Sequence, residues 1–261
     1  MNSARVFLVG GVLSFRALFN WIRPSIYIPT MLLGPVLQTV FFTYLGRYSG
    51  VADDRYFIVG NAVQTSAVAG VFGMVMSLAN EREFGTLAAI LATPTNRFAL
   101  FCGRAVPVVA NGLFVSTFGF MVAFFVLGFR MPLTAVPALA GTVALTAVSC
   151  AMFGLTVGSV GLRVRDLWVG SNLTYALMLL LCGVNVPLSV LPGWLAAAGR
   201  AMPLTHGIQA ARDLAGGARL SDVAGLIGWE ALIGLTYALV GYGLLRFFET
   251  ESRRRASLDL R

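Results

Sequence analysis

Runs of about 20 apolar residues recur along this chain between short polar breaks, and they constrain its fold more than any other feature. A helix needs about 20 such residues to cross the hydrocarbon core of a bilayer. Only 11% of the residues are charged, whereas soluble globular domains carry roughly a quarter. The sequence therefore predicts an all-α integral membrane protein, with one domain over residues 1–261 and no soluble domain attached.

The polar breaks divide the apolar part of the chain, residues 25–248, into six predicted transmembrane helices. These are expected at about 25–44, 56–78, 105–129, 133–162, 167–186 and 223–248. Gly34 and Pro35 predict a bend in the first span. Gly154 and Gly158 form a small-xxx-small pair, which predicts close packing between helices of the chain.

Two further membrane-associated segments are predicted outside these spans. In residues 1–24, arginines and an asparagine lie on one helical face and apolar side chains on the other, which indicates a helix in the membrane interface. Between the fifth and sixth spans, residues 187–222 are too interrupted by Pro and Gly for one helix and too apolar for a plain loop. Short helices that re-enter the outer leaflet fit this composition.

The distribution of arginine predicts the orientation of the chain in the membrane. With the N-terminus inside, 13 arginines fall on the cytoplasmic side and 6 on the other, which favours cytoplasmic termini. The basic tail, residues 249–261, would then lie against anionic lipid. Because the arginines are scattered among apolar spans, the net charge of +8 indicates membrane lipids rather than nucleic acid as partner. The arginine, alanine and glycine bias is typical of a GC-rich bacterial source, so we expect a bacterial cytoplasmic membrane.

All 19 basic residues are arginine, and the missing lysine excludes one class of activity. The phosphate-binding P-loop GxxxxGK[ST] needs its lysine to reach the β and γ phosphates of ATP. The chain therefore cannot be a P-loop ATPase by itself, and ATP-driven work would require a partner.

The loop between the second and third predicted spans carries an amphipathic pattern. Glu81 and Glu83 are expected to open a short cytoplasmic helix, since acidic residues favour a helix N-terminus. Phe84, Leu87 and Leu91 follow at helical spacing, and Pro94 ends the run. A solvated connector is the alternative interpretation.

Two motifs in these loops resemble the permease subunits of ABC transporters of the type-2 exporter (ABC-2) class. That family typically carries E-R-E-x-G-T-L followed by T-P, and this chain has Glu81 to Leu87 followed by Thr93 and Pro94. Family members often show P-x-x-x-x-P-x-W-L and then N-P-L-T, and the chain matches this with Pro187, Pro192, Trp194 and Pro203, followed by His206. Met202 departs from the usual asparagine.

The resemblance implies a mechanism with separate subunits. The coupling helix, which docks on the nucleotide-binding subunit, would be formed by Glu81, Arg82, Glu83, Phe84, Gly85, Thr86 and Leu87. ATP and Mg²⁺ would be bound by that partner ATPase, with no cofactor in this chain, and a second permease copy or a homologue would complete the transporter. Compact permeases of this kind resemble antibiotic exporters of the daunorubicin type, while relatives export lipids or lipid-linked polysaccharides.

Polar residues inside the predicted spans are candidates for a translocation path, because exposure to lipid would be costly. Interhelical hydrogen bonding is the alternative for each of them, and Glu230 could also contact a cationic substrate. The candidates are Gln38, Asn61, Gln64, Thr65, Asn111 and Glu230.

Other functional classes are disfavoured by the sequence. The three cysteines have no CxxC spacing, and one histidine cannot build a metal site with them. An intramembrane protease would need His206 near an activated serine, and no GxSxG elbow occurs. An ion-coupled carrier would need more buried acidic residues and an inverted repeat.

Overall fold

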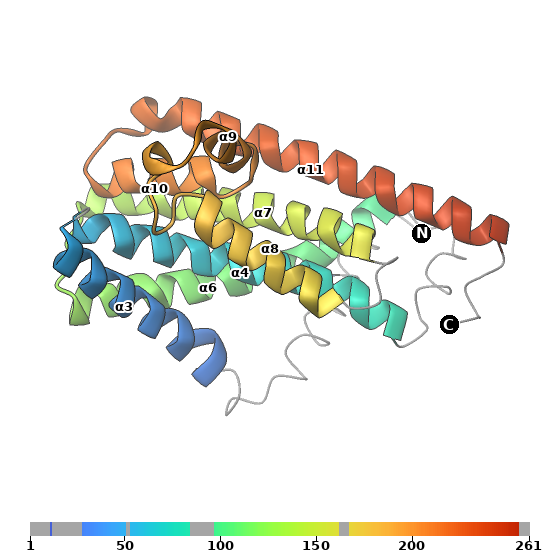
Figure 1. Cartoon of the computed structure of the whole chain (residues 1–261), viewed down its shortest axis with the longest axis horizontal. Helices are drawn as coiled ribbons and strands as arrows, with labels where there is room; N and C mark the ends of the chain where they lie inside the picture. The colour runs from blue at the N-terminus through green and yellow to red at the C-terminus, as the bar shows by residue number, and fades with distance from the viewer. Residues whose placement is uncertain (1–10, 12–27, 51–52, 84–96, 162–166, 256–261) are drawn as a thin grey trace.

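The computed structural model describes residues 11, 28–50, 53–83, 97–161 and 167–255, and within these ranges every regular element is a helix (Figure 1). The predicted interfacial helix in residues 1–24 lies outside the described residues, apart from Gly11. In chain order the elements are η1 (Ile28–Leu33), α3 (Gly34–Ser49), α4 (Asp54–Glu83), α6 (Arg97–Val126), η2 (Leu133–Ala135), α7 (Val136–Gly161), α8 (Leu167–Leu181), η3 (Leu188–Val190), α9 (Gly193–Ala201), α10 (Thr205–Ala215) and α11 (Leu220–Arg255).

Four helices of the described part are long and apolar enough to cross a bilayer, which confirms an all-α membrane protein. Within α8, the apolar stretch Val169–Leu181 is shorter than a full span. The count of six spans therefore stays a prediction. The four candidate spans are Asp54–Asn80, Cys102–Val126, Leu133–Gly161 and Leu220–Phe247.

The helices of the bundle run along a similar direction in both senses. Helices α4, α7 and α11 run one way, and α6 and the shorter α8 run the other (Figure 1). The start of α4 and helices α9 and α10 share one end of the bundle, and the C-terminal ends of α4, α7 and α11 share the other.

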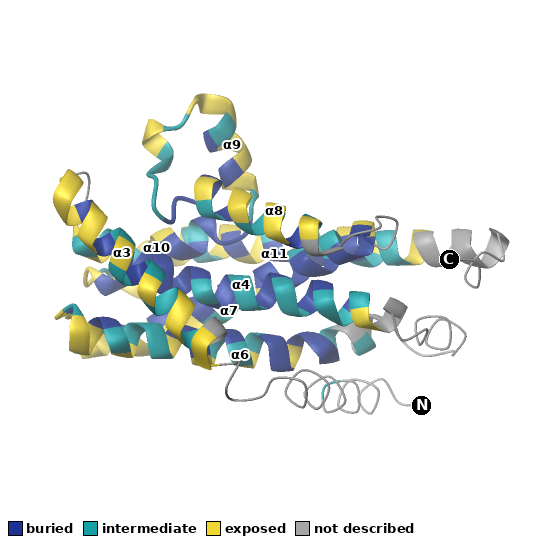
Figure 2. Cartoon of the chain, turned by 60° about the horizontal axis from the view of Figure 1, so that its bottom comes forward, coloured by how far each residue is buried: buried dark blue, intermediate teal, exposed yellow. Residues whose placement is uncertain are grey.

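Helices α4 and α7 form the centre of the bundle (Figure 2). In their most apolar windows 56% and 61% of the residues are buried, against 28% for α6 and 22% for α11. The predicted close packing of Gly154 and Gly158 is confirmed. A Cβ at Gly154 would lie 2.7 Å from the Val71 carbonyl oxygen, and one at Gly158 3.3 Å from the Val75 Cα. Glycine is therefore what lets α7 approach the backbone of α4.

Several predicted boundaries differ from the structure for local reasons. The bend at Gly34 and Pro35 appears as the change from the π-helix η1 to the α-helix α3. The fifth predicted span ends early, because α8 stops at Leu181 and Gly183 takes φ +73°. The last helix is longer than predicted and runs from Leu220 to Arg255. Its polar final turns lengthen α11 beyond the apolar stretch that the sequence pattern detects.

Candidate functional site

The candidate site is a polar cluster between α3, α4 and α8, which we define as Gln38, Asn61, Gln64, Tyr175 and Asn185. Gln38 Nε2 donates to Asn61 Oδ1 at 3.0 Å and to Gln64 Oε1 at 3.1 Å. Tyr175 donates its hydroxyl to Gln38 Oε1 at 2.8 Å. Asn61 Nδ2 donates to Asn185 Oδ1 at 2.7 Å, in the turn after α8. One hydrogen-bonded network therefore joins the consecutive helices α3 and α4 to α8, which follows more than 80 residues later in the sequence.

Helix geometry explains how α4 supplies two members of this cluster. Asn61 and Gln64 are three residues apart and so lie on the same face of the helix. Both are 1% exposed. Thr65, one residue further, instead donates to the carbonyl of Ala62 in its own helix at 2.7 Å. The predicted path residues on α4 thus separate into a pair that bonds across helices and a threonine whose hydroxyl donates within its own helix.

A backbone carbonyl fixes the orientation of every amide in the polar cluster. Asn61 Nδ2 also donates to the Phe57 carbonyl at 2.9 Å, and that oxygen can only accept. Asn61 Oδ1 must then face Gln38 Nε2, which in turn requires Gln64 to present its Oε1. By the same reasoning, Asn185 presents its oxygen to Asn61. The nitrogens of Gln64 and Asn185 are therefore the atoms left over, and both are buried without a hydrogen-bond partner.

Glu230, another predicted path residue, has a different environment from the cluster. Its side chain is fully buried on α11, and its two carboxylate oxygens accept the backbone N–H groups of Leu204 at 2.8 Å and Gly207 at 3.0 Å. Leu204 has φ +92°, a conformation that is rare for residues other than glycine. Glu230 therefore caps the N-terminus of α10 and holds the strained N-cap residue Leu204. Contact with a cationic substrate stays a prediction.

Arg212 on α10 was missed as a site residue from the sequence, where it appears only as one more arginine. Its guanidinium donates to the carbonyls of Tyr56, Gly183 and Val184 at 3.0, 2.8 and 2.9 Å, and it lies 3.5 Å from the centroid of the Tyr56 ring. Burial lowers the pKa of Arg212 to about 10, so the side chain stays charged at neutral pH. Arg212 thus ties α10 to the start of α4 and to the turn after α8.

The remaining predicted residues are distributed over the other helices. Asn111 lies half-buried on α6. Pro187 and Pro192 immediately precede η3 and α9, while Trp194 on α9 is 74% exposed. Pro203 is buried before α10, and the His206 ring stacks on Trp229 with 6.4 Å between ring centroids. Among the described residues no group of three His, Cys, Asp or Glu side chains could hold a metal ion.

The predicted coupling helix falls mostly outside the described residues, which resume at Arg97. One expectation about it is wrong: Glu81, Arg82 and Glu83 are the last residues of α4 instead of the first turn of a separate helix. The hydrophobic pattern of α4 ends earlier than its backbone hydrogen bonding, which is why the acidic pair seemed to start a new element.

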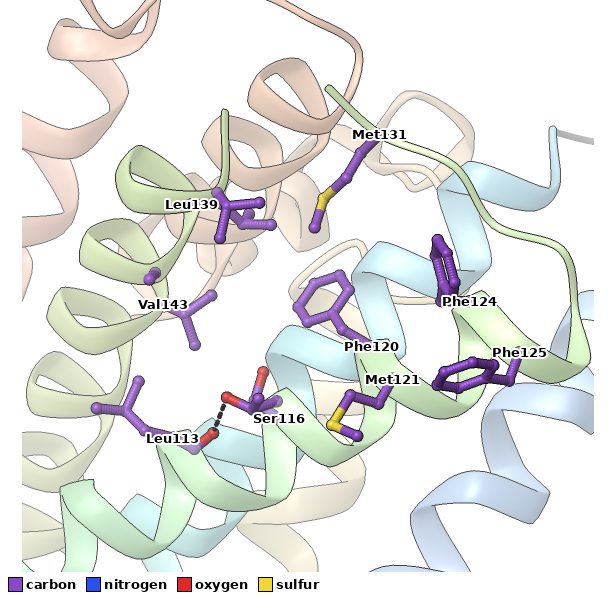
Figure 3. A pocket seen from close by; sticks show the side chains of 12 residues that line it. Leu113, Ser116, Phe120, Met121, Phe124, Phe125, Met131, Leu139 and Val143 are labelled. Atoms are coloured by element: carbon purple, nitrogen blue, oxygen red, sulfur yellow. Dashed lines mark hydrogen bonds between the residues drawn. The ribbon is translucent and has the colours of Figure 1, made fainter. Parts of the chain in front are cut away.

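A cavity of about 280 Å³ lies between α6 and α7, and no residue of the polar cluster lines it (Figure 3). Phe120 and Met121 of α6 and Leu139 and Val143 of α7 contribute to an almost wholly apolar lining. Its buried hydroxyl, that of Ser116, has no hydrogen-bond partner. The lining suits hydrocarbon and offers little to orient a polar ligand.

Comparison with known proteins agrees with these features. The profile of the family described as ABC-2 type transporter matches residues 11–215. A probable doxorubicin resistance ABC transporter permease, DrrC of Mycobacterium tuberculosis, is 28% identical over 92% of this chain and 91% of its own length. A probable multidrug ABC transporter permease, YbhR of Escherichia coli, is 26% identical over 71% of this chain and 49% of its own length. The chain belongs to the ABC-2 type transporter family.

Proposed function

We propose that this chain is the membrane-spanning permease subunit of an ATP-driven exporter that moves amphipathic drugs or antibiotics out of a bacterial cell. The match to the ABC-2 family over residues 11–215 carries the proposal, and the drug-resistance and multidrug names of two relatives support its cargo class. The family provides transmembrane subunits of ABC transporters, which implies an ABC ATPase as partner.

In this proposal the chain crosses the cytoplasmic membrane six times with both termini inside, and it pairs with a second copy or a homologue. The polar cluster would line the cargo path. The segment from Glu81 to Leu87 would dock on the ATPase, which binds ATP and Mg²⁺. Closure of the ATPase subunits would then move the spans as rigid bodies. Because α4 carries Asn61 and Gln64 and ends at Glu83, it would link the docking segment directly to the cargo path.

Reconstitution with the nucleotide-binding partner tests the cargo class. Drugs of the anthracycline type are expected to stimulate ATP turnover by the complex. If only lipids or lipid-linked polysaccharides stimulate ATP turnover, those compounds and not drugs are the cargo. Stimulation by neither, together with a failure to bind any ATPase subunit, would refute the proposal.

Cysteine labelling tests the orientation. In a variant without Cys102, Cys150 and Cys182, a cysteine introduced by Thr86→Cys should resist a membrane-impermeant reagent in intact cells. The control Arg130→Cys, at an exposed position in the turn between α6 and η2, should react. Labelling of the first and protection of the second would place the docking segment outside the cell, where no ATPase could reach it.

A further inference from the structure

Two hydrogen-bond donors of the polar cluster have no acceptor among the described residues. Both N–H groups of the Asn61 amide are used, by Phe57 and Asn185, and both N–H groups of the Gln38 amide are used, by Asn61 and Gln64. The two donors without an acceptor, Gln64 Nε2 and Asn185 Nδ2, lie at the two ends of this series of hydrogen bonds, and both atoms are buried. Since the Phe57 carbonyl fixes the direction of these hydrogen bonds, exchanging the oxygen and nitrogen of one side-chain amide would break another hydrogen bond of the cluster.

An unmatched buried donor is costly and uncommon. Each one costs roughly 1–3 kcal/mol in desolvation, and native structures pair almost all of their buried polar groups. Gln64 is 1% exposed, so bulk water does not reach its amide. Two such donors within one network require acceptor atoms that the described residues do not supply.

The chemistry of the cluster narrows the acceptor to a neutral oxygen. Its members carry no formal charge, whereas carboxylate and phosphate groups are usually bound by arginine. Arg212 is the arginine that lies beside Asn185, but it donates its N–H groups to the carbonyls of Gly183 and Val184. These N–H groups therefore point to the backbone and not to a ligand of the cluster. Phe72 on α4 meets the Tyr175 ring edge to face, with 6.4 Å between centroids, and adds an aromatic surface beside the cluster.

We infer that Gln64 and Asn185 form a donor site that binds carbonyl or hydroxyl oxygens of a flat aromatic cargo. The inference rests on the proposed function and adds the chemical group that the path recognises. It predicts selectivity between two cations that both contain a planar aromatic ring system: doxorubicin, which carries quinone and hydroxyl oxygens, and the smaller ethidium, which has no oxygen.

Fluorescence titration of the full chain with its ATPase partner in lipid nanodiscs tests this selectivity. Gln64→Met removes one unpartnered donor while keeping the side chain's length, and Asn185→Leu removes the other at a similar volume without adding a charge. Each should weaken doxorubicin binding about tenfold, the equivalent of about 1.4 kcal/mol, and change ethidium binding less than twofold. Ser116→Ala is the matched control, because it removes an unpartnered buried hydroxyl from the apolar cavity.

The outcomes separate this inference from the proposed function. If the wild-type complex binds doxorubicin and both variants bind it equally well, the inference fails and the exporter proposal stands. An equal loss of both probes would also overturn the inference, since the variants would then have damaged the path in general. If the wild-type complex binds neither probe, the drug-export proposal fails together with the inference.

Lipid ester carbonyls are a second source of acceptor oxygens. The thermal unfolding of wild type and Gln64→Met is measured in nanodiscs of ester-linked lipid and again in nanodiscs of ether-linked lipid, which has no ester carbonyl. The comparison distinguishes the two sources. If cargo is the ligand, the difference between the two proteins should be the same in both lipids. A wild-type advantage that exists only in ester-linked lipid would assign the donors to lipid and overturn the inference.

Discussion

Two buried polar regions of this bundle differ in how completely their hydrogen-bonding groups are paired. Around α10, the carboxylate of Glu230 accepts two backbone amides and Arg212 donates to three carbonyls. In the polar cluster between α3, α4 and α8, the amide nitrogens of Gln64 and Asn185 have no acceptor. Both regions contact the first half of α4, so the contrast does not come from a different depth or a different part of the fold.

The contrast indicates different tasks. A fully matched buried network rigidifies the elements that it joins, which suits a joint between α10, α4 and α11. A network with unpartnered donors holds its helices less firmly, and an added acceptor would stabilise it. Substitutions in the α10 joint should therefore lower stability, while substitutions in the polar cluster should change ligand binding.

The largest loss of stability is expected for Glu230→Ala. This substitution leaves the N–H groups of Leu204 and Gly207 buried and unpaired, at a cost of about 4 kcal/mol in total. Thermal unfolding in nanodiscs, followed by tryptophan fluorescence, measures the loss. Asp222→Ala on the same helix is the control, since Asp222 accepts the N–H of Arg219 in an exposed setting. Equal stability of the two variants would show that Glu230 does not hold α10.

Arg212→Met should have the next largest effect, about 2 kcal/mol, because it removes charged hydrogen bonds to three carbonyls while filling a similar volume. Limited proteolysis of the segment between α8 and α10 should accelerate in parallel. Arg200→Met, at an exposed arginine on α9, serves as the control and should unfold like wild type. Unchanged proteolysis in Arg212→Met would contradict a joint at this position.

A smaller loss is expected for Gly60→Ala, which leaves every polar group of the joint in place. A Cβ at Gly60 would lie 2.6 Å from both Arg212 Nη2 and the Val184 carbonyl oxygen, so the guanidinium must shift. Overpacking should outweigh the gain in helix propensity and leave a net loss of about 1 kcal/mol. Gly141→Ala on α7 meets nothing within 4 Å and should be neutral or stabilising, as measured by the same unfolding assay.

The sequence predicted the helical class and most of the helices, because apolar runs and their polar breaks are local signals. It also selected Gln38, Asn61 and Gln64, since polar residues stand out within apolar spans. Interhelical hydrogen bonding was the alternative interpretation for each of them, and the structure shows it. The sequence could not name the partners, because these depend on which faces of α3 and α4 meet. Tyr175 and Asn185 were missed for the same reason, as they lie more than 100 residues from Asn61 in sequence.

The segment between α8 and α11 shows the same limit. Its Pro and Gly content predicted short helices, and α9 and α10 are confirmed. Glu230 stood out as an acid within an apolar span, yet its partners are backbone amides, which have no sequence signature. The role of Arg212 depends likewise on carbonyls that the break after α8 exposes. The sequence shows which side chains are unusual for the span that they lie in. It does not show which backbone groups of other elements they contact.

The smallest effect on stability is expected for Gln64→Met, and it sharpens the comparison most. The substitution removes one hydrogen bond from Gln38 but also removes an unpartnered buried amide nitrogen, so the two changes should cancel to within about 1 kcal/mol. Without ligand, Gln64→Met should unfold close to wild type, and saturating doxorubicin should stabilise the wild-type complex by a larger margin. A loss in the ligand-free protein as large as that of Glu230→Ala would mean that Gln64 is a structural joint too, and the distinction between the two regions would disappear.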